Sequence, residues 1–251
     1  MKGCASQWWL FLLAACGRLH FDATADGSGS ATYVQTVLAD GPVGYWRLGE
    51  KAGTIAFDSS GHGLDGTYQG GLLLGQAGAI AGDPDSAVLL DGSTGLVRIP
   101  NSPGINAISN SVVTVEAWVS GGLTETAELF STWDGTTNGF QVVWDSGDAG
   151  SFAANQGVRS PRPITDNNWH QVVIVWNGGT TTVYVDAQLA ASGSSPFTPS
   201  AFENQIGTQC FSALSTGCSL FHGGGIDEVS VYDAALDSAR IQAHYAAARP
   251  L

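Results

Sequence analysis

Carboxylates are the side chains of this sequence that could hydrolyse a glycosidic bond, and their spacing argues against that chemistry. A glycosidase needs two carboxylates that flank the scissile bond, roughly 5–5.5 Å apart for retention or 6.5–9.5 Å apart for inversion. Residues i and i+2 of a strand share a face, whereas adjacent residues point to opposite faces. Glu116 has Thr114 and Trp118 as same-face neighbours in its predicted strand, so it has no acid beside it. Asp227 and Glu228 are adjacent, and a regular strand would separate their side chains.

The other closely spaced acids give no stronger pattern. Asp83 and Asp85 have i, i+2 spacing, but Pro84 between them predicts a turn. Glu125 and Glu128 fall in a predicted loop. The histidines are scattered along the sequence, which has no nucleophile elbow, zinc-protease motif or phosphate loop. We therefore predict that the protein is not an enzyme; a polysaccharide-active hydrolase or lyase with an atypical acid pair is the alternative.

Tryptophans offer a second kind of chemistry, because an exposed ring presents a large flat face on which a sugar can stack. Trp133 precedes Asp134-Gly135, which is a turn signal, and its ring is the best candidate for exposure among the tryptophans of the folded domain. Trp144 before Asp145 shows a weaker form of the same pattern. We predict Trp133 and Trp144 as ligand-binding residues.

The composition is that of a single acidic globular domain. Hydrophobic residues make up 43% of the 251 positions, enough for a sizeable core, and only 12% are charged. The formal net charge is −13 and there is no basic run, so we expect no nucleic acid partner. The acidity fits a protein that stays soluble outside the cell; the alternative is that some carboxylates bind a cation.

The first residues have the pattern of an export signal. After Lys2, an apolar run from Trp8 to Ala15 is too short to span a bilayer and resembles a signal peptide. It ends in Leu-Ala-Ala followed by Cys16, which resembles the lipobox of bacterial lipoproteins, in which the cysteine thiol is acylated and becomes the mature N-terminus. The alternative is an ordinary cleaved signal in which Cys16 is incidental.

The lipobox resemblance divides the sequence into three parts. Residues 1–15 would be the signal peptide, residues 16–32 a flexible tether and residues 33–251 the folded domain. Gly17 stands where an aspartate often retains lipoproteins in the inner membrane. The resemblance thus implies an exported protein, lipid-anchored to the bacterial outer membrane or cell surface, that contacts the membrane through its anchor only.

Two cysteines lie in the predicted folded domain. Cys210 and Cys218 are eight positions apart. In an exported domain two such residues most simply form one disulfide. A metal-binding pair is the alternative, although no second Cys or His pair is spaced to complete a zinc site.

Short apolar stretches separated by turn residues predict an all-β fold. The breaks contain Asn-Gly and Asp-Gly pairs, which tolerate the positive φ angles of hairpin turns. We expect antiparallel sheets packed face to face, and one helix near the C-terminus that Asp237 caps by accepting hydrogen bonds from first-turn amides. The predicted strands include Ser86–Leu90, Leu96–Ile99, Val113–Val119, Phe140–Trp144, Gln171–Trp176, Thr181–Val185 and Ile226–Tyr232.

Five motifs in order resemble the laminin-G-like domains of the concanavalin A-like lectin/glucanase superfamily. They are GYWRLGEKAGTIAFDSSGHGLDGTY, LDGSTGLVRIP, VTVEAWV, DNNWHQVVIVWNGGTTTVYVDA and GGGIDEVSVYDAALDSARIQAHY. One departure is Ala187, where the family usually has glycine. The resemblance implies a jelly-roll sandwich of two antiparallel sheets with a short C-terminal helix, and it assigns Trp46, Trp118 and Trp169 to the core.

The same resemblance implies at most one structural calcium ion. Many members hold calcium with an acid from the last strand, and Asp227 in GGGIDEV matches the place of that acid. Asp58 in FDSSG lies in a glycine-rich loop that could supply carbonyl ligands. The alternative is that Asp58 caps a turn and that Asp227 accepts hydrogen bonds from backbone amides.

The function that these observations favour is a non-catalytic, envelope-anchored binding module whose partner is a glycan or a surface protein. Fold alone does not decide function, so two rivals stay open. An exposed aromatic ring beside polar groups would favour the binding module. A facing pair of carboxylates in a groove would favour the enzyme, and a smooth surface without aromatic rings would favour a structural envelope protein without a soluble ligand.

Overall fold

The computed structural model describes residues 32–106, 112–121, 126–135, 138–145, 151–155, 157–161, 164, 166–200, 202–210 and 217–249. All of these residues belong to one compact unit, residues 31–251. The predicted signal peptide, the lipidation site Cys16 and all but the last residue of the predicted tether lie outside the described residues.

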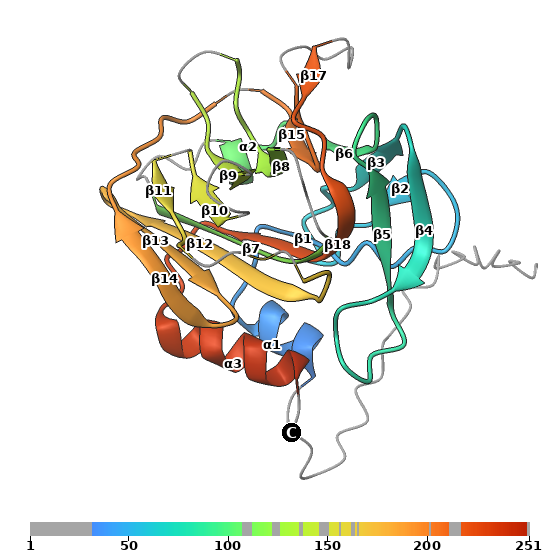
Figure 1. Cartoon of the computed structure of the whole chain (residues 1–251), viewed down its shortest axis with the longest axis horizontal. Coiled ribbons are helices and arrows are strands. Elements are labelled where there is room, and N and C mark those ends of the chain that lie inside the picture. The colour runs from blue at the N-terminus through green and yellow to red at the C-terminus, as the bar shows by residue number, and fades with distance from the viewer. Residues whose placement is uncertain are drawn as a thin grey trace, which may run out of the picture. The chain divides into compact units, whose positions relative to one another are not determined.

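Two antiparallel sheets form the body of the unit (Figure 1). We call the first sheet A; its central strands are β12, β7 and β18, and β1 also pairs with β18. Its strands, in spatial order and with β1 last, are β14 (Gln188–Gly193), β13 (Thr180–Val185), β12 (His170–Asn177), β7 (Val112–Ser120), β18 (Gly223–Tyr232), β5 (Ser86–Asp91), β4 (Leu72–Ala77) and β1 (Gly44–Trp46).

The second sheet, sheet B, packs against the first. Its strands, in spatial order, are β11 (Val158–Arg159), β10 (Ser151–Ala154), β9 (Gln141–Asp145), β8 (Ala127–Ser131), β15 (Asn204–Ile206), β6 (Leu96–Ile99), β3 (Gly66–Gln69) and β2 (Ile55–Ala56). A separate hairpin joins β16 (Gln209–Cys210) to β17 (Cys218–Ser219), and the predicted Cys210–Cys218 disulfide crosses it. Every predicted strand named above is confirmed within one residue of its bounds except the last, which starts three residues earlier, at Gly223; the two-sheet sandwich is confirmed as well.

The core lies between the sheets because side chains alternate along each strand. Val172, Ile174 and Trp176 of β12 point into this core. Val173 and Val175 point the other way, into a second apolar cluster on the outer face of sheet A. Both faces of β12 are therefore covered, which explains why its sequence is apolar from Val172 to Trp176.

Two helices cover that outer face. Figure 1 shows α1 and α3 on one side of sheet A and strands β8, β9 and β10 on the other. The helix α3 (Ser238–Ala248) begins as predicted, because Asp237 accepts a 2.9 Å hydrogen bond from the amide of Arg240.

The sequence-based expectation of a single helix was wrong. Helix α1 (Tyr33–Ala39) opens the folded unit, and α2 (Pro103–Asn106) is a further short turn of helix. Thr32 caps α1 through a capping box with Gln35, so the residue predicted to end the tether starts a helix. Seven residues are too few to show a clear 3.6-residue period, and α1 becomes stable only by packing Tyr33 and Val37 on sheet A.

A buried carboxylate ties both helices to the sheet. Glu116 of β7 is fully buried and accepts hydrogen bonds from the hydroxyl of Tyr33 at 3.0 Å and the amide of Gln171 at 2.7 Å. Its other oxygen lies 2.7 Å from Nδ1 of His244 in α3. The far nitrogen of the same ring lies 2.8 Å from Asp40, at the end of α1. Glu116, His244 and Asp40 thus link β7, α3 and α1 in one chain.

We predict that this chain makes the free energy of unfolding depend on pH. Burial alone would lower the pKa of His244, but Glu116 and Asp40 outweigh it and raise the pKa above its ordinary value of 6.5. A base whose pKa is raised by folding stabilises the fold fully below its unfolded pKa, and this contribution is lost as pH rises through the folded pKa. Unfolding free energy should therefore fall above pH 6.5, and His244→Gln should flatten that fall.

Chemical denaturation at a series of pH values measures this effect. His62→Gln, in an exposed turn before β3, is the matched control and should leave the profile unchanged. A profile in His244→Gln that is as steep as in the original chain would contradict the prediction.

Candidate functional site

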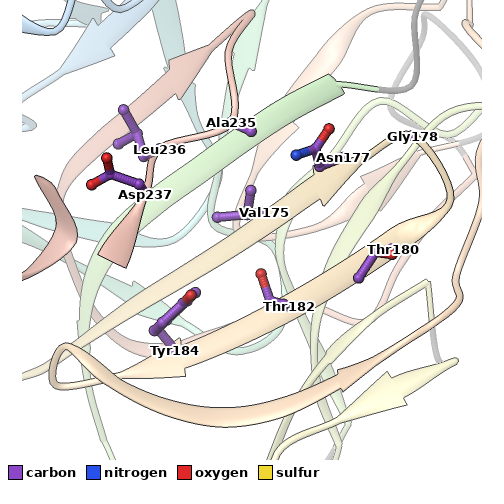
Figure 2. Close-up of a pocket in the computed structure, with 9 residues that line it drawn as sticks. All are labelled: Val175, Asn177, Gly178, Thr180, Thr182, Tyr184, Ala235, Leu236 and Asp237. Carbon is purple, nitrogen blue, oxygen red and sulfur yellow. The ribbon is translucent and has the colours of Figure 1, made fainter. Parts of the chain in front are cut away.

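A groove of about 580 Å³ lies on the outer face of sheet A, beside the N-terminus of α3 (Figure 2). Strands β12 and β13 form its floor, and the segment that leads from β18 into α3 forms its wall. The residues that line it are Val175, Asn177, Gly178, Thr180, Thr182, Tyr184, Ala235, Leu236 and Asp237.

The floor displays hydroxyl groups because of strand alternation. Thr180, Thr182 and Tyr184 follow one another at i, i+2 and i+4 along β13, so they share the outer face. Val183 and Val185 between and after them are buried in the core of the sandwich. The result is a row of three hydroxyl-bearing side chains that ends in an aromatic ring (Figure 2).

The wall is held in place by a threonine in the middle of sheet A. Thr114 of β7 donates a 2.7 Å hydrogen bond to the carbonyl oxygen of Ala234 and accepts a 3.0 Å bond from the amide of Leu236. Thr114 also pairs with Val175, the apolar floor residue. This anchors the wall at a fixed distance from the floor, and the next residue, Asp237, is the cap of α3.

The lining of the groove has the chemistry that a sugar requires. It offers three hydroxyls, the amide of Asn177, the carboxylate of Asp237 and the ring of Tyr184. Hydroxyls and amides both donate and accept hydrogen bonds, as sugar hydroxyls do. None of the nine lining residues that the structure describes is Lys, Arg or His, so the only formal charge among them is negative.

The predicted calcium residues divide into two cases. Asp58 accepts hydrogen bonds from the amides of Tyr45, Ser60 and Leu64 at 2.9–3.0 Å. Burial alone would raise its pKa, but these bonds lower it. Asp58 therefore has the turn-capping geometry that was the alternative to a calcium ligand.

Asp227 keeps a free oxygen. One carboxylate oxygen accepts a 2.7 Å bond from the amide of Ala79, while Oδ1 is buried without a hydrogen-bond partner among the described residues. Burial raises the pKa of Asp227 well above its ordinary value. Within the described part of the chain, no three acid, histidine or cysteine side chains are grouped to hold a metal ion.

The strand that carries Asp227 is not regular, which corrects one expectation. A β-bulge interrupts the pairing of β18 with β7 between Asp227 and Ser230, and Glu228 has a φ of +54°. A bulge redirects side chains that would otherwise alternate. Strand alternation therefore does not fix the directions in which the adjacent carboxylates of Asp227 and Glu228 point.

The sequence of this chain is similar to those of a known superfamily. The chain matches the family model of the concanavalin A-like lectin/glucanases superfamily over residues 91–242, more than half of its length. The chain belongs to this superfamily. No curated protein matches it.

Solved structures agree with the superfamily fold. The sialidase of Trypanosoma rangeli superposes with a TM-score of 0.57 at 16% identity, over 82% of this chain and 32% of the sialidase, so the chain spans about a third of that enzyme. Domain 4 of the arabinanase AbnA from Geobacillus stearothermophilus, in complex with arabinotriose, has a TM-score of 0.54 at 21% identity over 81% of this chain and 98% of the domain. The binding domain of botulinum neurotoxin DC, in complex with SialylT, has a TM-score of 0.58 at 11% identity over 85% and 53%. These similarities concern the fold alone.

The structure corrects one of the two tryptophan predictions in this lectin-like sandwich. Trp144 is 1% exposed and packs between the two sheets, so it cannot stack on a ligand. It is the penultimate residue of β9 on the inner face, and the strand does not turn before Asp145 as expected. Trp133 is half-buried after β8 and does not line the groove; its role in binding stays a prediction.

The location of Glu128 was also predicted wrongly. It lies in β8, fully buried, where burial raises its pKa well above the ordinary value. The amide of Gln141 donates to it at 3.3 Å. Glu125, the acid that was paired with it in the sequence, lies outside the described residues.

Sequence reasoning missed the groove residues, although part of the signal was present. Residues 182–185 alternate hydroxyl-bearing and apolar side chains, which marks one face of β13 as polar. Nothing local connects that face to Leu236 and Asp237, more than fifty positions later. Their proximity comes from the pairing of β7 with both β12 and β18.

Proposed function

We propose that the protein is a non-catalytic glycan-binding module and that the groove beside α3 is its binding site. The observation that carries this proposal is the row of Thr180, Thr182 and Tyr184 on the floor of the groove, opposite the carboxylate of Asp237. A pyranose could stack on Tyr184 and exchange hydrogen bonds with the two threonines. Support comes from the superfamily and from neighbours whose structures hold arabinotriose or SialylT.

The positions of the carboxylates favour binding over catalysis. Asp237 is the only acid among the described residues that line the groove, and one of its oxygens already caps α3. Glu116 and Glu228, the acids that could have formed an atypical pair, are buried and bonded to neighbouring side chains. A single acid supplies a general acid-base contribution of only about 10²–10⁴-fold.

A glycan fits the groove better than a surface protein does. Specific protein interfaces have an apolar centre with aromatic anchors. The groove instead exposes hydroxyls and an amide, and its apolar surface is limited to Val175, Ala235, Leu236 and the ring of Tyr184. A groove lined with hydroxyls, an amide and an aromatic ring therefore favours a binding module over a structural envelope protein without a ligand.

We predict that Tyr184 and Thr182 carry the affinity for a glycan. Tyr184→Ala should weaken binding roughly fivefold to tenfold, about 1–1.4 kcal/mol, because a stacked ring is lost. Thr182→Val should weaken it roughly fivefold, about 1 kcal/mol, because one hydrogen bond is lost at constant shape. A glycan array identifies the strongest binder, and isothermal titration calorimetry then compares the variants.

One control variant and one further test variant complete this experiment. Thr67→Val, exposed on β3 of sheet B, is the matched control and should bind as the original chain does. Asp237→Asn keeps a good helix cap and removes the negative charge that would repel a sialylated glycan, so it should improve binding of sialylated relative to uncharged glycans. The absence of binding to every glycan, or equal losses in Thr67→Val and Thr182→Val, would rule out the groove as the site.

We further predict no turnover of polysaccharides. Laminarin, alginate, agarose, chitin and peptidoglycan should yield neither reducing ends nor unsaturated products after incubation with the protein. The physical reason is the lack of a second carboxylate opposite Asp237 among the described lining residues. Product formation that is lost in Asp237→Asn or in Glu228→Gln would favour the enzyme alternative.

Envelope anchoring is also a proposal, and it depends on Cys16. No helix among the described residues is long and apolar enough to cross a membrane. We predict that metabolic labelling with a fatty-acid probe marks the original chain and Cys4→Ser but not Cys16→Ser. The acyl chains would hold the module at the membrane, since each buried CH₂ contributes about 0.8 kcal/mol. Equal labelling of the two serine variants would contradict the anchor.

A further inference from the structure

One arginine sits at the centre of a group of carboxylates at the β18 bulge. Nη2 of Arg47 lies 2.9 Å from an oxygen of each of Asp83, Asp85 and Glu228. Its Nε donates a further 3.0 Å bond to Glu228, whose second oxygen accepts a hydrogen bond from Tyr45. A single nitrogen that meets three carboxylates occupies the position that a metal ion would take among acid ligands.

A fourth carboxylate completes the group. Asp227 precedes Glu228 at the bulge and keeps Oδ1 buried and unpartnered among the described residues. A β-carbon added to Gly78 would lie 2.9 Å from the carbonyl oxygen of Asp85 and 3.2 Å from Asp227 Oδ2, so these two residues approach the same point. Gly49 is similarly constrained, because an added β-carbon would lie 1.8 Å from Asp85 Oδ1.

The charges in this group leave little room for a second cation. Arg47 is three-quarters buried, with its side chain 24% exposed, and Glu228 is 1% exposed. Arg47 therefore fills a largely buried position among these carboxylates.

The residues present therefore do not fit a resident calcium ion as the superfamily resemblance suggests. Calcium takes six to eight oxygen ligands at 2.3–2.6 Å, and a guanidinium among those oxygens excludes it by both volume and charge. We propose that Arg47 is a built-in cation that replaces a bound divalent ion at this bulge. Its removal would leave one oxygen each from Asp83, Asp85 and Glu228 facing a vacated space near the unpartnered oxygen of Asp227, and water would supply the remaining ligands of a calcium ion.

Thermal melts in calcium chloride and in EDTA test the proposal, together with calorimetric titration of calcium. The original chain should melt at the same temperature in both solutions and take up no calcium at this site. Arg47→Ala should melt several degrees lower in EDTA, regain at least half of that loss in calcium, and bind calcium. Arg47→Lys, which keeps the cation, should not respond to calcium.

A second substitution locates the effect. In Arg47→Ala/Asp227→Asn the calcium response should fall by at least half, because one free ligand oxygen has been replaced by an amide. Folding of Arg47→Ala only in calcium would support the proposal. If Arg47→Ala folds in neither solution, the same measurements are made on Arg47→Gln, whose uncharged side chain fills more of the vacated space. A melting temperature of the original chain that drops in EDTA, or folded Arg47→Ala and Arg47→Gln that ignore calcium, would overturn the proposal. These calcium experiments do not measure glycan binding, so their outcome is independent of the proposed function.

Discussion

The contact between the buried Glu116 carboxylate and His244 fixes the outer layer of the molecule. A charge at the centre of a sheet is tolerated only when its hydrogen bonds are satisfied, and here Tyr33, Gln171 and His244 satisfy them. Because Tyr33 belongs to α1 and His244 to α3, the same contact sets where both helices lie. The position of α3 in turn fixes Asp237, and with it one wall of the groove. The proposed binding site is thus a consequence of how one carboxylate is buried.

Four of the scarce basic residues are paired with carboxylates. Arg47 meets three carboxylates at the bulge, Arg98 pairs with Glu203, Arg159 with Asp145 and Arg240 with Asp40. The net charge of −13 is therefore carried by a surface with few cations to offer. We expect such a surface to repel anionic ligands at a distance, which would favour an uncharged ligand at the proposed binding groove. The pairing of these arginines with carboxylates and the expected preference for an uncharged ligand both follow from the small number of basic residues.

The bulge and the groove show how a common fold gains individual properties. Both lie where a strand of sheet A leaves regular pairing or meets the end of a helix. The regular parts of the sandwich supply stability through alternating apolar side chains, while the irregular parts place polar groups in positions that alternation alone would not give. This division explains why neighbours that share the fold at 11–21% identity need not share a ligand.

The sequence by itself determined the elements whose signals are local. Apolar stretches between turn residues predicted β7, β12 and β13, a capping aspartate predicted the start of α3, and two isolated cysteines predicted the disulfide that the structure contains. Tertiary structure alone decided that Trp144 points inward, that Glu128 lies in a buried strand, that α1 is a helix, and that residues 235–237 face β13. The physical reason is the separation along the chain of the residues that interact. Periodicity and capping depend on residues within one turn or strand, whereas a bulge, a short helix held by packing and the wall of a groove depend on pairing between segments far apart in the chain.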